Sequence, residues 1–149
     1  MKVRTSIAAA GAAVVLAGTG ALLLPAVASA HSTTHTLKFT AVQLKSSNFS
    51  KTAGGSAEKD VNSAGKIIGY DVTNFQFHPA TNTASGGVAL STSGGFLYGA
   101  LKFTSNSSVV HGTVTGGTGA FKGATGTITA KQLNKSGTRT AVTISYTTP

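Results

Sequence analysis

The amino-acid sequence predicts an all-β fold of short antiparallel strands, arranged as a closed barrel or as a β-sandwich. Thr, Ser, Gly and Val dominate the chain beyond residue 30, and no long stretch repeats apolar residues at helical spacing. Apolar and polar residues alternate instead, which is typical of strands that bury one face. Turn-forming clusters such as SGG (93–95) and NKSG (134–137) separate these runs at short intervals. A closed antiparallel barrel is attractive because it leaves no sheet edge exposed.

Seven runs are predicted to be strands. In the first, Leu37, Phe39 and Ala41 share one face, and in the second a kink is expected at Gly69. The segments 46–65 and 78–87 are polar and rich in turn residues, so they are expected to be loops. The predicted strands are 35–44, 66–78, 87–92, 96–105, 108–116, 123–133 and 138–147.

Residues 1–30 have the pattern of a secretory signal peptide. A basic start, MKVRTS, precedes an apolar run and the small-residue motif Ala28-Ser29-Ala30. A transmembrane anchor is the alternative, but glycines and a proline interrupt the apolar run and the cleavage motif follows it directly. We therefore expect a secreted protein that begins at His31, with a single domain over 31–149 and no membrane span after removal of the signal.

The chain is basic and has no cysteine. It contains 12 Lys and Arg against 3 Asp and Glu, a formal net charge of +9. The lysines are scattered and Arg139 is the one arginine beyond residue 30, whereas nucleic-acid readers typically cluster arginine among aromatics. No nucleic-acid partner is expected, and the surface is predicted to be a basic one that can rest against an anionic cell envelope. Without cysteine, disulfides and thiolate chemistry are excluded.

A glycine-rich segment, 114–130, raises the question of a phosphate-binding loop. A P-loop needs Gly-Lys followed by Ser or Thr, and a dinucleotide site needs G-x-G-x-x-G opening a helix. Neither pattern is met, because Lys122 stands at the third glycine position and the β-branched sequence TGTITA follows. The glycines are therefore predicted to serve a tight turn and the crowded strand after it: Gly116, Gly117, Gly119, Gly123 and Gly126.

The same segment carries a family resemblance. GGTGAFKGATG (116–126) resembles the GGTGxF/Y-x-GAxG signature of the allene oxide cyclase-like barrels, the group that includes plant dirigent proteins and secreted bacterial relatives. HTLKFTAV resembles the first strand of that group, GKIIGYDVTNFQF its second and AVTISYT its closing strand, so the likeness covers most of 35–147.

The resemblance implies an eight-stranded antiparallel barrel around an apolar cavity, often assembled as a trimer, so a homotrimer or a homodimer is expected. Such barrels bind an apolar small molecule and steer its cyclisation or coupling, without cofactor or metal. Two departures stand out: Ala41 or Val42 occupies the position of the family's first-strand acid, and Tyr70 that of its second-strand arginine. The acid–arginine pair of the family is therefore not carried over, and whether the protein is an enzyme stays open.

Few side chains could supply chemistry. Glu58 and Asp60 lie in the predicted loop 46–65, where a solvated position is expected. Asp71 lies within a strand: facing the cavity it is a candidate general acid or base, and facing outward it is an ordinary surface charge. Tyr70 is the second weak catalytic candidate. The aromatic side chains predicted to line a ligand pocket are Phe39, Tyr70, Phe75, Tyr98 and Phe121.

Two functions compete at this point. In one, the barrel holds an open cavity and binds an apolar small molecule; in the other, it is a non-catalytic extracellular or envelope protein with a filled interior. The state of the interior decides between them, because a binding site needs open volume with a few converging polar groups.

Overall fold

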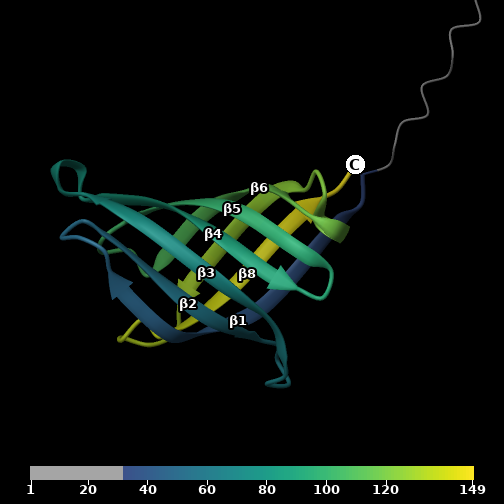
Figure 1. Ribbon diagram of the computed structural model, residues 1–149, viewed down its shortest axis with the longest axis horizontal. Helices are drawn as coiled ribbons and strands as arrows, with labels where there is room; N and C mark the ends of the chain where they lie inside the picture. Colours follow the sequence, from purple (N-terminus) through teal and green to yellow (C-terminus); the bar gives the residue numbers. More distant parts are fainter. Residues whose placement is uncertain (1–31) are drawn as a thin grey trace, which may run out of the picture.

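The computed structural model describes residues 32–149, which form one closed antiparallel barrel in which each strand pairs with its neighbour in the chain and the last pairs with the first (Figure 1). The predicted signal peptide and the start at His31 lie outside the described residues. The strands are β1 (Thr34–Asn48), β2 (Ala53–Val61), β3 (Ile67–His78), β4 (Thr83–Thr92), β5 (Gly95–Thr104), β6 (Val109–Gly117), β7 (Thr125–Gln132) and β8 (Arg139–Thr147). Two short 3₁₀ turns, η1 (Pro79–Thr81) and η2 (Gly119–Phe121), lie in connections.

Alternation along the strands builds the core. In β5, Leu97, Gly99 and Leu101 are buried, whereas the residues between them, Tyr98 and Ala100, are exposed. Alternate side chains of a strand point to opposite faces, so one row of side chains from each strand faces the barrel interior. The buried apolar residues are Phe39, Ala41, Ala84, Leu90, Leu97, Leu101, Val114, Phe121, Ala124, Ile128 and Ile144.

The prediction of two long loops was wrong. Segment 46–65 contains β2, and β4 begins at Thr83 rather than at residue 87. The strand β2 was missed because its inward residues, Ser56, Glu58 and Asp60, are polar, so it lacks the apolar alternation that identifies its neighbours. This strand completes the barrel and brings the count to the eight that the resemblance implies.

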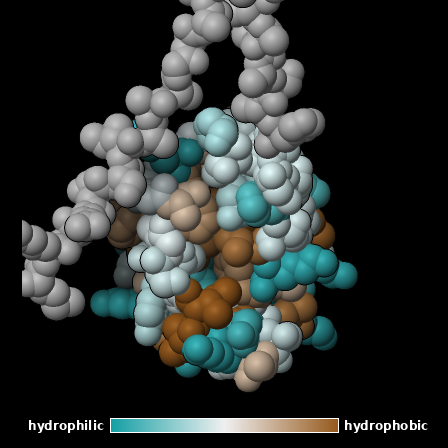
Figure 2. Space-filling view, turned by 90° about the vertical axis from the view of Figure 1, so that its right-hand side faces the viewer, coloured by the Kyte–Doolittle hydropathy of each residue, from teal (hydrophilic) through white to brown (hydrophobic). Residues whose placement is uncertain are grey.

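The two ends of the barrel differ. One end, called the closed end here, carries the β2–β3 and β4–β5 turns, the η2 connection and the chain terminus at residue 149 (right in Figure 1). Phe121 of η2 is buried there and meets Tyr146 of β8 edge to face, with ring centroids 5.5 Å apart. Figure 2 looks onto this end and shows apolar surface among polar residues. The opposite end, with the turns after β1, β3, β5 and β7, is called the open end.

The glycine-rich segment forms the β6–β7 connection at the closed end. Gly119 has φ +58°, a left-handed conformation that favours glycine, and the N–H of the next residue, Ala120, donates to the carbonyl of Gly94 over 2.8 Å. Thr118 N–H donates to the carbonyl of Phe96, also over 2.8 Å. The backbone groups of this turn are thus engaged with the neighbouring β4–β5 turn, and β7 rather than a helix follows it.

Among residues 32–149, no helix has the length and apolar character needed to cross a membrane.

Candidate functional site

The barrel encloses a cavity of about 280 Å³. It extends from Leu90 and Leu97 in the core toward Gly137 in the β7–β8 turn, at the open end. This volume lies just below the roughly 300–1,000 Å³ of typical small-molecule sites, so the cavity suits a small ligand. The barrel is therefore not filled solid, and the space is positioned where a β-barrel mouth commonly binds ligands.

The cavity has two chemically different walls. Strands β2 and β3 contribute the polar side, with Ser56, Glu58, Asp71 and Thr73. The facing wall is aliphatic and comes from β4 to β8, where the lining residues include Val88, Leu90, Leu97, Leu101, Val110, Ile128, Val142 and Ile144. Three phenylalanines also line the space: Phe39, Phe75 and Phe103.

All three acidic residues of the chain lie on β2 and β3, and two of them, Glu58 and Asp71, line the cavity. Glu58 of β2 and Asp71 of β3 are directly opposite each other in the antiparallel ladder, and Asp60 follows two residues after Glu58 on the same inward face. Gly69 is the residue opposite Asp60. A Cβ at Gly69 would collide with the carbonyl oxygen of Ser91 in β4, whereas Asp60 Oδ2 would lie at an ordinary contact distance of 3.5 Å.

Burial and mutual repulsion raise the pKa of each carboxyl group. Desolvation is the main cause at Glu58, whose pKa rises from 4.5 to about 8, with further increases from a hydrogen bond to Asp71 and from its charge. Desolvation also raises the pKa of Asp60 and that of Asp71 to about 6. These three carboxyl groups, called the acidic cluster here, therefore retain protons near neutral pH that isolated carboxyl groups would have lost.

Hydrogen bonding within the cluster is incomplete. Thr73 Oγ1 donates to Asp71 Oδ1 over 3.5 Å, a long contact. Asp60 is fully buried, and neither of its carboxylate oxygens receives a hydrogen bond from an N–H or O–H donor. Such a group is costly to bury in ionised form.

The structure places only some of the predicted site residues in the cavity. Phe39, Phe75 and Asp71 line the cavity. The prediction that Tyr70 and Tyr98 line the pocket was wrong, because both rings are exposed on the outer face of the barrel. Tyr70 lies between the buried residues Gly69 and Asp71, which belong to the inward row of β3. Phe121 packs at the closed end, outside the cavity lining.

The expectation that Glu58 and Asp60 are solvated was wrong as well. It followed from the assignment of 46–65 as a loop, and β2 instead turns both side chains inward. The sequence held one signal for this arrangement: Ser56, Glu58 and Asp60 recur at the spacing of two that marks one face of a strand. Phe103 was also missed as a lining residue.

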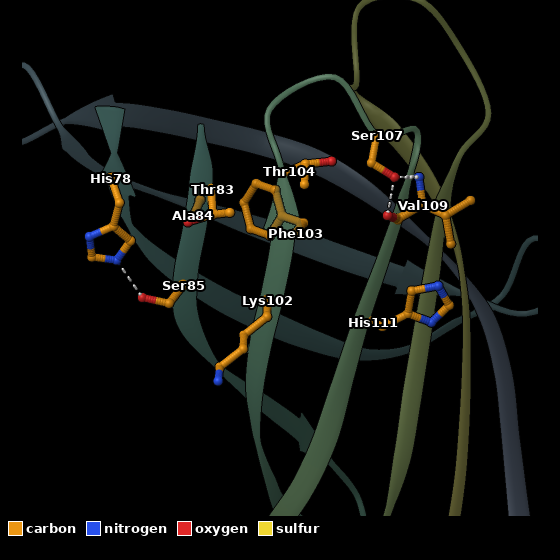
Figure 3. Close-up of a pocket in the computed structure, with 10 residues that line it drawn as sticks. All are labelled: His78, Thr83, Ala84, Ser85, Lys102, Phe103, Thr104, Ser107, Val109 and His111. Atoms are coloured by element: carbon orange, nitrogen blue, oxygen red, sulfur yellow. Dashed lines mark hydrogen bonds between the residues drawn. The ribbon is translucent and has the colours of Figure 1, made fainter. Parts of the chain in front are cut away.

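A wider hollow of about 640 Å³ lies near the open end, over β3 to β6 (Figure 3). His78, Lys102 and His111 border it with exposed side chains, and His78 Nε2 lies 3.0 Å from Ser85 Oγ. We place the candidate site in the interior cavity instead, because its polar groups are buried and converge. Within residues 32–149, no three or more His, Cys, Asp or Glu side chains are arranged to hold a metal ion.

Comparison with known proteins identifies the fold. No protein-family model matches the sequence, and no curated protein matches it. Among solved structures, pyocyanin demethylase superposes with a TM-score of 0.62 at 16% identity, over 75% of this chain and 99% of that chain. The pterocarpan synthase dirigent protein GePTS1 gives 0.62 at 17% identity, over 78% and 89% of the two chains.

A second pterocarpan synthase dirigent protein, PsPTS1, superposes with a TM-score of 0.51 at 16% identity, over 77% of this chain and 92% of that chain. These matches confirm the fold that the glycine-rich signature indicated. The chain has the closed eight-stranded antiparallel barrel of the dirigent and allene oxide cyclase-like fold, at low sequence identity to the solved structures that share it.

Proposed function

We propose that the protein binds an apolar small molecule inside the barrel and steers a cyclisation or coupling of it by proton transfer. One observation carries the proposal: Glu58 and Asp71 converge on one wall of a largely apolar cavity, and the third acidic residue of the chain, Asp60, is buried beside them. A barrel that served only as a stable body would gain nothing from buried, incompletely paired carboxyl groups, which cost stability. The named functions of two proteins with this fold, pyocyanin demethylase and pterocarpan synthase, are both conversions of small molecules.

The carboxyl pair Glu58–Asp71 suits general acid–base chemistry. A catalytic acid or base works best when its pKa lies near the working pH, and desolvation raises the pKa of Glu58 to about 8 and that of Asp71 to about 6. In a ring closure, the protonated Glu58 gives its proton to the group that departs or accepts electrons. The Asp71 carboxylate takes the proton from the attacking hydroxyl or amine. The pair then holds the same number of protons as before, and one proton transfer between them restores the starting state.

Glu58 lies on β2, which carries neither the family's acid position nor its arginine position, and Asp71 is the neighbour of Tyr70 on β3. Ala41 of β1 lines the same cavity but has no acidic group, and Tyr70 is on the outer face. Asp71 and Glu58 would therefore replace the missing groups from β3 and β2.

Filling the cavity is expected to abolish ligand binding. Ala130 of β7 lines the cavity, so Ala130→Phe places a phenyl ring in the space without adding charge. We expect the neutral fluorescent probe N-phenyl-1-naphthylamine to bind the folded wild type with about one-to-one stoichiometry. We expect its affinity to fall about tenfold or more in the variant, because the ring takes volume that the probe needs. A fluorescence titration measures both.

Tyr70→Ala is the matched control, since it removes an aromatic ring from the outer face and is expected to leave probe binding unchanged. If the wild type binds no probe, or if Ala130→Phe binds it as tightly as the wild type does, the cavity is not the binding site and the proposal fails.

A further inference from the structure

The ligand's charge can be inferred from what the cavity lacks. Twelve Lys and Arg residues occur in the chain, yet no Lys, Arg, His or Tyr is among the residues that line the cavity. The residues that face the cluster from adjacent strands are uncharged: Ala41 and Gln43 of β1 oppose Asp60 and Glu58, and Leu90 of β4 opposes Asp71. The acidic wall therefore has no cationic partner of its own within the barrel.

The cluster also has an unused hydrogen-bonding capacity. Asp60 is fully buried, and both of its carboxylate oxygens lack a hydrogen-bond donor. Buried carboxylates are normally paired with a cation or with several donors. Protons reduce the charge of the three acids, as the raised pKa values indicate, and a positively charged group supplied by the ligand would stabilise them in ionised form.

The rest of the cavity fits the body of such a ligand. The wall facing the acids is aliphatic, and the rings of Phe39, Phe75 and Phe103 line the same space. Aromatic faces attract organic cations, most strongly where water is excluded. Polar uncharged side chains, Gln43, Gln132 and Thr140, complete the lining.

We propose that the cavity selects an organic cation, a small apolar skeleton carrying a protonated amine or quaternary nitrogen that lies against Glu58 and Asp71. This inference rests on the proposed function, since it assigns a charge to the ligand of the same cavity. It follows that such a ligand displaces protons from the cluster when it binds, so its affinity rises with pH. The affinity of a neutral ligand of the same shape does not rise with pH, because such a ligand does not favour the ionised carboxylates.

The test uses two probes that differ only in charge. Phenyltrimethylammonium is permanently cationic, and tert-butylbenzene has the same shape with carbon in place of nitrogen. The affinity of each probe is measured by how well it displaces N-phenyl-1-naphthylamine from the folded protein. We expect the cation to bind about tenfold or more tightly than its neutral counterpart near pH 8.5, and the preference to shrink to about twofold or less near pH 5, where the cluster is protonated.

Variants locate the effect. Glu58→Gln combined with Asp71→Asn is expected to remove the cation preference at both pH values while keeping the shape of the wall. Because the chain has no acid outside the cluster, the matched control adds a positive charge instead: Val72→Lys, on the outer face of β3 next to Asp71, is expected to keep the preference. Circular dichroism checks that each variant is folded.

The outcomes separate the two proposals. If N-phenyl-1-naphthylamine binds but the neutral probe displaces it as well as the cation near pH 8.5, the cavity is a binding site without charge selection, and this inference is wrong. A preference that persists unchanged in the Glu58→Gln, Asp71→Asn variant also overturns it. If no probe binds the wild type, the proposed function fails with it.

Discussion

Lowering the pH from about 9 to about 5 is expected to raise the free energy of unfolding by roughly 3 kcal/mol, an estimate reduced for solvent screening of the half-buried Glu58. The folded-state pKa of Glu58 is about 8 and those of Asp60 and Asp71 are about 6, whereas their ordinary values are 4.5 and 3.8. Between these values the folded state binds more protons than the unfolded chain. Stability is therefore fully present below about pH 4 and is lost as the pH rises through 6 to 8. Urea titrations at several pH values measure it.

The triple variant Glu58→Gln, Asp60→Asn, Asp71→Asn is the control for this pH dependence. Each change keeps the shape of the side chain and removes its titration, so most of the slope between pH 5 and 9 should disappear. A wild type that loses stability on acidification over that interval would show that the cluster is satisfied in its ionised form, contrary to the burial seen at Asp60.

Gly126→Ala is expected to cost more than about 3 kcal/mol of stability, enough to unfold a barrel of ordinary stability. A Cβ at this position in β7 would meet the carbonyl oxygen of Ser145 and lie 2.7 Å from the Cα of Tyr146, both in the backbone of β8. Backbone cannot rotate away as a side chain can, so the β7–β8 ladder would have to open. Thermal unfolding followed by circular dichroism gives the change in midpoint.

Gly65→Ala is the matched control. It also adds one methyl group, at φ +77°, but nothing lies within 4 Å of the added atom. Only backbone strain of about 1–2 kcal/mol is expected there. Equal costs at the two positions would mean that crowding against β8 does not explain why glycine is needed at residue 126.

Much of the barrel could be predicted because its strands bury apolar rows. In β5, Leu97 and Leu101 alternate with exposed residues, and the glycine-rich turn after β6 marks the fold. The strand β2 could not be recognised in this way, since polar side chains occupy the row that faces the interior. A pattern search that expects buried residues to be apolar fails where the inward row of a strand is polar.

The candidate site was predicted only in part for the same reason. Asp71 was identified as a candidate, but its direction was left open, because alternation around the kink predicted at Gly69 does not show which face of the strand turns inward. The register does shift beside Gly69, between Asp60 and Val61, yet Gly69 and Asp71 keep the inward face and Tyr70 the outward one. The partner of Asp71, Glu58, depends on the pairing of β2 with β3, which local sequence does not specify.

The double pairing of β1 governs the order in which this protein can fold. Seven of the strand pairs join neighbours in the chain, but β1 also pairs with β8, so that Thr34 lies opposite Thr147. Contacts between residues so far apart are slow to form, because the intervening chain must first be ordered. We therefore expect hairpins to form early and β8 to join last. Thr140, Val142 and Ile144 of β8 are part of the cavity wall, so the cavity is complete only when that last strand is in place, and a bound ligand would slow its departure.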